Sequence, residues 1–274
     1  MNNHIDSNYC RLKLLLFFLP FVLLFFIAIG LYFMGCMSTN GYITIQKGTF
    51  MFINASVKQY PNILFNLTQF GDALIFLSFL SVLVIYAPRL WESLITASLF
   101  SLIFSASMKA FFAIPRPAAA FGNTFNVIGE RLSGSNSFPS GHSMTVFTIL
   151  TVLMFAFMPK RNLHKVAFFI FIVLLGLVFA FTRVGVGAHY PLDVIVGCIV
   201  GYISGLLGTF VSKEYKLWAW VYNKKYYPIF IALFLVSAVV LVNRIRTENL
   251  VIYYLSFTSL VVSLYKIIAT YVKK

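Results

Sequence analysis

The sequence predicts an all-α, polytopic membrane helix bundle. Of the 274 residues, 60% are hydrophobic and only 10% are charged, and the mean hydropathy is +0.89. A water-soluble domain cannot bury so much apolar surface, so lipid must solvate a large part of the chain. The 31 Phe and 15 Tyr residues are typical of proteins whose aromatic rings lie at the bilayer interfaces.

Eight apolar runs are candidates to cross the bilayer, because a hydrocarbon core of about 30 Å requires about 20 apolar residues. They lie near residues 14–34, 71–88, 92–114, 141–158, 165–183, 190–212, 227–243 and 250–270. An even number of crossings places both termini on one side. The longest loops, about 35–70 and 115–140, share the other side, and the first is expected to form short interfacial helices. The segment around His4 is expected to be a mobile polar tail.

The distribution of basic residues predicts which side is cytoplasmic. With the N-terminus inside, the inner side carries 12 of the 21: Arg11, Lys13, Arg89, Lys160, Arg161, Lys165, Lys213, Lys216, Lys224, Lys225, Lys273 and Lys274. The outer side carries 8: Lys47, Lys58, Lys109, Arg116, Arg131, Arg183, Arg244 and Arg246. The last one, Lys266, lies within the final run. This excess predicts cytoplasmic termini in a plasma or inner membrane. Because the charges are scattered over short loops, anionic lipid explains the net charge of +14 better than nucleic acid does.

Polar residues at the expected helix ends gather in three clusters, all on the outer side. In the first, Lys109 lies inside the apolar run 92–114, where a cation is costly. Arg116 stands between Pro115 and Pro117, whose stiff backbone limits where the guanidinium can point. A planar, five-donor guanidinium suits phosphate oxygens.

The second cluster opens the run 141–158 with Ser140, Gly141 and His142. Ser140 is typical of an N-cap, and the unpaired amides and dipole of a helix start favour an anion. His142 stands in that first turn, where its imidazole could donate a proton to an atom leaving the phosphate.

The third cluster joins the runs 165–183 and 190–212. Arg183 ends the first run, and His189 and Asp193 flank the start of the second, about one helical turn apart. The carboxylate can then accept the second N–H of the imidazole, which leaves the other ring nitrogen free as a base or a nucleophile. An acidic residue in a membrane segment marks a candidate functional site.

Three cations, a helix start, two histidines and one aspartate suit phosphoryl transfer. The cations would grip the phosphate oxygens while one histidine attacks phosphorus and the other protonates the leaving oxygen. The same set does not suit a metal, because the cations would repel it and Asp193 is already engaged by His189. We therefore expect no metal and no cofactor.

The three clusters resemble the signature of the type 2 phosphatidic acid phosphatase superfamily of integral-membrane lipid phosphatases. The matching segments are Lys109 to Arg116-Pro117, Pro139-Ser140-Gly141-His142, and Thr182-Arg183 to His189 to Asp193. Their order, their internal spacings and their positions at helix ends all agree with that signature. One departure is Thr182, where the family usually has Ser; the hydroxyl is kept.

The resemblance implies a role for each residue. His189 would be the nucleophile that forms a phosphohistidine, Asp193 would orient it, and His142 would be the general acid. Five further residues would bind the phosphate: Lys109, Arg116, Ser140, Gly141 and Arg183. The family's six-helix core would correspond to residues 1–212. Residues 213–274 would add an aromatic, basic cytoplasmic loop and two extra crossings of open role.

The function expected from these residues is removal of phosphate from a lipid phosphate or pyrophosphate at the outer leaflet. Undecaprenyl pyrophosphate and lipid A are the favoured substrates, and oligomeric state stays open. A phosphotransferase that moves phosphate between two lipids through the same intermediate is the main alternative. An anion-binding transporter is a remote one, since it explains the arginines but neither the two histidines nor the spacing of His189 and Asp193.

Overall fold

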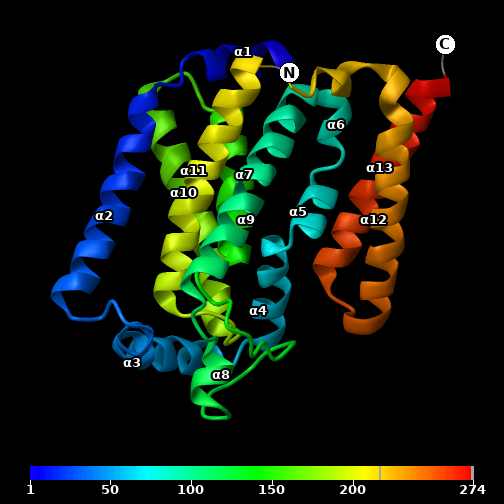
Figure 1. Ribbon diagram of the computed structural model, residues 1–274. Helices are drawn as coiled ribbons and strands as arrows, with labels where there is room; N and C mark the ends of the chain where they lie inside the picture. Colours follow the sequence, from blue (N-terminus) through cyan, green and yellow to red (C-terminus); the bar gives the residue numbers. More distant parts are fainter. Residues whose placement is uncertain (216, 273–274) are drawn as a thin grey trace.

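The computed structural model describes residues 1–215 and 217–272, so Lys216, Lys273 and Lys274, which belong to the predicted inner set, lie outside the described residues. Within the described part the chain is a bundle of helices with no strand (Figure 1). Six helical segments are long and apolar enough to cross a membrane, and Gly141–Ala156 is a shorter apolar helix among them. The predicted all-α, multi-pass membrane fold is confirmed.

The helices in chain order are α1 (Asn2–Cys10), η1 (Leu14–Phe17), α2 (Phe18–Phe33), α3 (Thr39–Val57), α4 (Pro61–Thr68), η2 (Gln69–Gly71), α5 (Ala73–Phe79), α6 (Leu83–Tyr86), α7 (Pro88–Phe112), α8 (Pro117–Phe121), α9 (Gly141–Ala156), α10 (Asn162–Gly185), α11 (Pro191–Tyr215), η3 (Ala219–Tyr222), η4 (Lys224–Tyr226), α12 (Tyr227–Glu248) and α13 (Val251–Val272). Helix α1 and the end of α13 lie at one end of the bundle, and α3 and α8 lie at the other (Figure 1).

The predicted crossing at 71–88 is wrong as a single helix. The segment forms the short helices α5 and α6 with a break between them, and both lie in line with α4 along the bundle (Figure 1). A break inside a bilayer is tolerated only where the freed backbone groups find partners within the protein. A serine of α13 supplies one: Ser259 donates to the carbonyl of Phe79, at the break, at 2.8 Å. Ser256 of the same helix donates to the carbonyl of Ile75, within α5, at 3.1 Å.

The hairpin of α12 and α13 therefore packs directly on the broken segment. The hydroxyls of Ser81 and Ser263 bond at 2.8 Å, and Arg244 Nη1 of α12 lies 2.9 Å from Asp72 Oδ2 at the start of α5. Hydropathy does not reveal such contacts, because the partners are about 180 residues apart in sequence. A division of the chain near residue 212 into a core and a C-terminal part stays a prediction.

The structure differs from two expectations, one about the N-terminal segment and one about the loop 35–70. The N-terminal segment is not a mobile tail: it forms α1, whose Ile5 and Tyr9 are buried, and Asn8 donates to the carbonyls of Ala156 at 3.0 Å and Met158 at 3.1 Å. Because those carbonyls end α9, Asn8 supplies the partners that a helix C-terminus lacks. The loop 35–70 contains the short helix α4, of 8 residues, as expected, but also α3, which at 19 residues is longer than the short helices expected there.

Helices α9 and α11 pack closely along a row of glycines on α11. A Cβ at Gly197 would lie 2.7 Å from the carbonyl oxygen of Ser140, and one at Gly201 would lie 2.5 Å from that of Met144. Both distances are too short for any other residue, so the two backbones touch, as small residues permit in membrane bundles. This contact holds the start of α9 against the start of α11.

We predict that the triple variant Ser256→Ala, Ser259→Ala and Ser263→Ala is destabilised. Each interhelical hydrogen bond in a membrane protein contributes about 0.6 kcal/mol on average, so the loss should total about 2 kcal/mol and lower the thermal midpoint in detergent. Ser237→Ala is the matched control, since among the described residues its hydroxyl bonds only to Leu233 O in its own helix. Equal midpoints for the triple variant and the control would contradict the role assigned to these serines.

Candidate active site

The three polar clusters meet at the end of the bundle that lies opposite α1. The end of α7, the start of α9, the end of α10 and the start of α11 come together there (Figure 1). The backbone N–H of Ser140 donates to the carbonyl of Asp193 at 3.0 Å, and a Cβ on Gly141 would lie 3.2 Å from Lys109 Nζ. The predicted site residues are thus brought together, while their individual roles stay predictions.

Arg116 lies directly beside His189. Its Nη1 is 3.3 Å from His189 Nε2 and donates to the carbonyl of Ala188 at 3.2 Å. Its Nε donates to Asn136 Oδ1 at 2.6 Å, so the guanidinium is held on two edges. The backbone of Arg116 is restrained, as expected between two prolines. Arg116 is the N-cap of α8, and its own N–H donates to Gly134 O at 2.9 Å.

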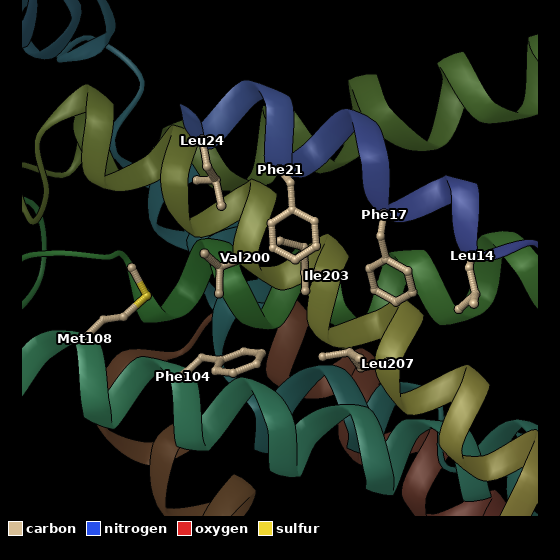
Figure 2. Close-up of a pocket in the computed structure, with 9 residues that line it drawn as sticks. All are labelled: Leu14, Phe17, Phe21, Leu24, Phe104, Met108, Val200, Ile203 and Leu207. Atoms are coloured by element: carbon tan, nitrogen blue, oxygen red, sulfur yellow. The ribbon is translucent and has the colours of Figure 1, made fainter. Parts of the chain in front are cut away.

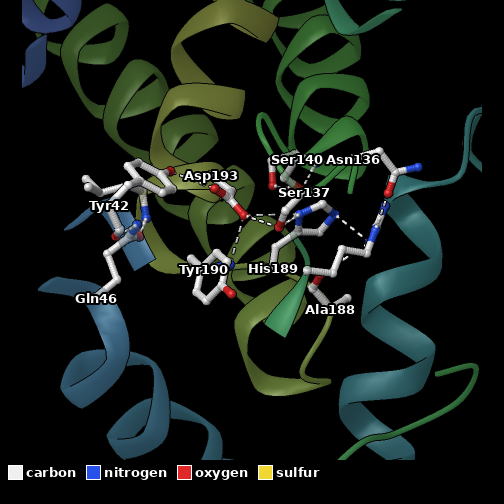
Figure 3. A network of polar contacts seen from close by, with 12 residues as sticks. Tyr42, Gln46, Asn136, Ser137, Ser140, Ala188, His189, Tyr190 and Asp193 are labelled. Carbon is white, nitrogen blue, oxygen red and sulfur yellow. Dashed lines mark hydrogen bonds and ion pairs between the residues drawn. The ribbon is translucent and has the colours of Figure 1, made fainter. Parts of the chain in front are cut away.

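Asp193 is fully buried and is held by three donors (Figure 3). Tyr42 donates to Oδ1 at 2.6 Å, and Ser137 and the backbone N–H of Tyr190 donate to Oδ2 at 2.5 and 3.0 Å. His189 Nδ1 lies 3.5 Å from Oδ2, one helical turn away as the spacing predicts but farther than a normal hydrogen bond. The carboxylate is therefore fixed from several sides and faces the imidazole nitrogen that points away from Arg116.

The surroundings of His189 favour its neutral form. Burial, together with the positive charges of Arg116, Arg183 and Lys109, lowers the pKa of His189 well below its ordinary value. A neutral imidazole has a free lone pair, which a nucleophile requires. Burial and the Asp193 carboxylate raise the pKa of the Tyr42 hydroxyl, so Tyr42 stays protonated and donates.

Ser140 caps α9, as the sequence predicts. Its hydroxyl accepts from the N–H of Ser143 at 3.3 Å and from the Ser143 hydroxyl at 2.9 Å. The amides at the start of α9 therefore point out of the helix beside Lys109 and can receive an anion.

Arg183 is buried at the end of α10 and retains a free donor. Its Nη1 donates to Thr68 Oγ1 at 3.0 Å, while its Nε has no hydrogen-bond partner among the described residues. A buried charged donor without a partner is costly, and phosphate oxygens would satisfy it. Thr182, the departure from the family signature, donates to Phe179 O at 2.5 Å, so its hydroxyl is engaged within its own helix.

His142 is positioned from outside its own helix by Gly71, at the end of η2. A Cβ on Gly71 would lie only 2.4 Å from the Cβ of His142 and 2.7 Å from its Cδ2. Gly71 immediately precedes Asp72, which is paired with Arg244. The start of the broken segment therefore packs against His142, and the C-terminal hairpin is linked to that segment through the ion pair of Asp72 and Arg244.

Sequence patterns did not single out several residues of this site. Tyr42, Gln46, Thr68 and Gly71 lie in the outer loop or at the edge of a predicted crossing, with no local signal of function. Gln46, for example, accepts from the N–H of Leu192 at 2.7 Å. Asn136 and Ser137 have a weak signal, since they immediately precede Pro139-Ser140-Gly141-His142 in an otherwise ordinary polar loop.

Comparison with known proteins agrees with the resemblance read from the motifs. Residues 90–216 match the model of the PAP2 superfamily. The lipid A 4'-phosphatase of Bacteroides thetaiotaomicron is 33% identical over 88 residues, which are 32% of this chain and 36% of that protein. The lipid A 1-phosphatase of Rhizobium johnstonii is 43% identical over 79 residues, 29% of each chain. The chain thus matches about a third of the length of these curated relatives.

A solved structure covers more of the fold. The crystal structure of LpxE from Aquifex aeolicus matches with a TM-score of 0.50 and 28% identity, over 60% of this chain and 94% of that one. The segment that matches the PAP2 superfamily model, residues 90–216, holds all three clusters.

We predict that Gly71→Ala lowers turnover by displacing His142. The added methyl would meet the Cβ of His142, which cannot swing away as a flexible side-chain end can, so the imidazole must shift. A shift of about 1 Å in a catalytic group can cost about a hundredfold in rate. The measurement is kcat on a lipid phosphate for folded, purified protein.

Gly48→Ala on α3 is the matched control, because a Cβ there meets nothing within 4 Å. If Gly71→Ala turned over as fast as Gly48→Ala, the close contact would have no part in placing His142.

Proposed function

We propose that this protein is a lipid phosphate phosphatase that works through a phosphohistidine. The observation that carries the proposal is the contact between His189 Nε2 and Arg116 Nη1 at 3.3 Å, with Asp193 on the opposite ring nitrogen. A phosphate held by Arg116 would lie within reach of the nucleophilic nitrogen. Lys109, Arg183 and the amides at Gly141 would take the remaining oxygens.

The reaction would proceed in two steps. His189 Nε2 attacks phosphorus and forms the N–P bond while the bond from phosphorus to the ester oxygen breaks, and His142 gives that oxygen its proton. A water molecule then attacks the phosphohistidine, His142 takes the proton of the water, and inorganic phosphate leaves with His189 restored. Asp193 stabilises the positive charge that develops on the imidazole.

An apolar groove beside the site supports a lipid substrate. It lies between α2, α7 and α11, has a volume of about 540 Å³ and is lined by Leu14, Phe17, Phe21, Leu24, Phe104, Met108, Val200, Ile203 and Leu207 (Figure 2). Met108, which lines the groove, precedes Lys109 in α7, so a hydrocarbon chain in the groove would reach the level of the proposed phosphate site along that helix.

The relatives support a choice of substrate, and the basic residues support an orientation in the membrane. Lipid A and undecaprenyl pyrophosphate are the favoured substrates, the first supported by the names of two relatives. The excess of basic residues at the predicted inner loops supports cytoplasmic termini in an inner or plasma membrane, with the site facing the periplasm or exterior.

We predict that His189→Ala lowers phosphate release by about a thousandfold or more, because no other group can form the covalent intermediate. Wild-type protein given radiolabelled lipid phosphate and quenched in alkali should carry acid-labile label, and the variant should carry none. His164→Ala is the matched control, since His164 is exposed in the first turn of α10. Wild-type turnover by His189→Ala would overturn the mechanism.

We also predict that hydrolysis needs no metal ion, because the site's own cations neutralise the phosphate. Protein dialysed against EDTA should release phosphate at the rate of untreated protein. The measurement is repeated after Mg²⁺, Mn²⁺ or Zn²⁺ is added back. Activity lost in EDTA and restored by one of these ions would contradict the prediction.

A further inference from the structure

A pocket of about 660 Å³ adjoins α1, at the end of the bundle opposite the candidate active site (Figure 1). Four elements that are far apart in sequence line it, namely α1, α7, α11 and η3. Most of the lining residues carry a polar or charged group: Asp6, Tyr9, Cys10, Arg89, Glu92, Lys213, Ala219 and Tyr222. None of them belongs to the candidate active site, so an inference about this pocket does not depend on the proposed function.

Arg89 and two carboxylates form an ion cluster in the wall of this pocket. Arg89 Nε donates to Asp6 Oδ1 at 2.7 Å, and Arg89 Nη1 donates to Glu92 Oε2 and, at 3.1 Å, to the carbonyl of Ser212. The side chains of Arg89 and Glu92 are 5% and 0% exposed, while that of Asp6 is half exposed. The cluster therefore holds two negative charges and one positive charge, an imbalance that is unfavourable away from water.

One oxygen of Glu92 lacks a hydrogen-bond donor. Oε2 accepts from Arg89 Nη1 and, at 3.1 Å, from the hydroxyl of Tyr222, whereas Oε1 is buried and meets no donor among the described residues. The Tyr9 hydroxyl, in the wall of the same pocket, is also buried and makes no hydrogen bond within the described part of the chain. A buried charged acceptor without a donor is costly, and a donor that enters the pocket would recover that cost.

The charge of the cluster selects the chemistry of that donor. An anion would meet two carboxylates. A metal ion would meet the Arg89 guanidinium and too few ligands, because the described residues contain no group of three His, Cys, Asp or Glu side chains that could hold one. A neutral donor would complete the hydrogen bond and leave the excess negative charge. A primary ammonium group supplies both a positive charge and three N–H donors.

The surroundings of the pocket favour a lipid headgroup as the source of the ammonium. The chain that follows α11 forms η3 and η4, which begin at or contain two tryptophans and two lysines: Trp218, Trp220, Lys224 and Lys225. Aromatic and basic side chains of this kind gather at the level of lipid headgroups. Lys213 also lines the pocket, and its only ion pair among the described residues is with the exposed Glu214 at 3.2 Å, which water weakens. A phosphodiester can therefore compete for Lys213.

We propose that this pocket binds a primary ammonium group and that the group belongs to the headgroup of an aminophospholipid in the adjacent leaflet. The ammonium donates to Glu92 Oε1 and to the oxygen of the Tyr9 hydroxyl, and it balances the second carboxylate of the cluster. Lys213 binds the phosphodiester of the same headgroup. A zwitterionic lipid thus meets an opposite charge at both of its own charges.

Cys10 is a native reporter of occupancy, because it is exposed and lines the pocket. Purified full-length protein is placed in phosphatidylcholine nanodiscs in which phosphatidylethanolamine replaces a rising fraction of the lipid. Mass spectrometry then follows alkylation of Cys10 by a water-soluble maleimide. Phosphatidylethanolamine at about ten times its dissociation constant should slow this reaction about tenfold, because only the free site reacts. Phosphatidylcholine, whose ammonium has the same charge and no N–H, should not protect. Cys36, between α2 and α3, is the internal control.

Two variants test the acceptors. Glu92→Gln removes the unpaired carboxylate and should weaken protection by phosphatidylethanolamine about tenfold or more, the value of one hydrogen bond to a charged group. Tyr9→Phe removes a hydroxyl that makes no hydrogen bond within the described residues, so the fold is kept, and protection should weaken about three- to tenfold. Glu214→Gln is the matched control, because it removes a carboxylate at the same end that does not line the pocket. Thermal midpoints show which variants keep the fold.

Equal protection of Cys10 by phosphatidylethanolamine and phosphatidylcholine would overturn the ammonium site. Full protection in Tyr9→Phe would overturn it as well, and this variant decides alone if Glu92→Gln loses its fold. A last arm adds soluble glycerophosphoethanolamine to protein in phosphatidylcholine nanodiscs. If this soluble amine protected Cys10 as well as the lipid does, the lipid would be overturned as the occupant.

Discussion

The backbone contact between α9 and α11 is the constraint on which the rest of the site depends. At Gly197 and Gly201 no Cβ fits between the two helices, so the start of α9 is pressed against the first turns of α11. This places the amides at the start of α9 beside Asp193, whose carbonyl accepts from the N–H of Ser140 at 3.0 Å. In a membrane such contact must come from close packing, because burial away from water contributes little between helices already in lipid.

Buried cationic side chains surround this contact, and few carboxylates are available to neutralise them. Arg116 and Arg183 are buried, and the Asp193 carboxylate is occupied by Tyr42, Ser137 and a backbone amide. Buried cations without a counter-charge are unfavourable, and an anion that enters recovers that cost. Burial and the same charges lower the pKa of His189, so the positive charge that would attract a phosphate also favours the neutral imidazole that the proposed mechanism requires.

The C-terminal hairpin takes part in this arrangement through the broken segment before α7. Ser259 of α13 donates to the carbonyl of Phe79 at the break, and Ser256 donates to the carbonyl of Ile75 in α5. Gly71, which precedes α5, lies against His142. Arg244 of α12 fixes the adjacent Asp72. The last two helices thus reach the site through contacts with the broken segment.

The sequence by itself determined the fold class and where the site would be found. Apolar runs indicate lipid exposure directly. Ionisable residues within or at the ends of these runs, such as Lys109 and Asp193, are costly in a membrane and therefore indicate a candidate functional site. Spacing alone placed His189 one turn from Asp193. These signals are local, so they can be read from neighbouring residues.

Only the tertiary structure decided how the site is supported. Tyr42 reaches Asp193 across 151 residues, and Ser81 meets Ser263 across 182. The break between α5 and α6 has little signal in hydropathy, because the segment is largely apolar and the serine that bonds to the carbonyl at the break lies on α13. Pairings of this kind depend on which helices become neighbours, and hydrophobic patterning in a membrane leaves that choice to packing and hydrogen bonds.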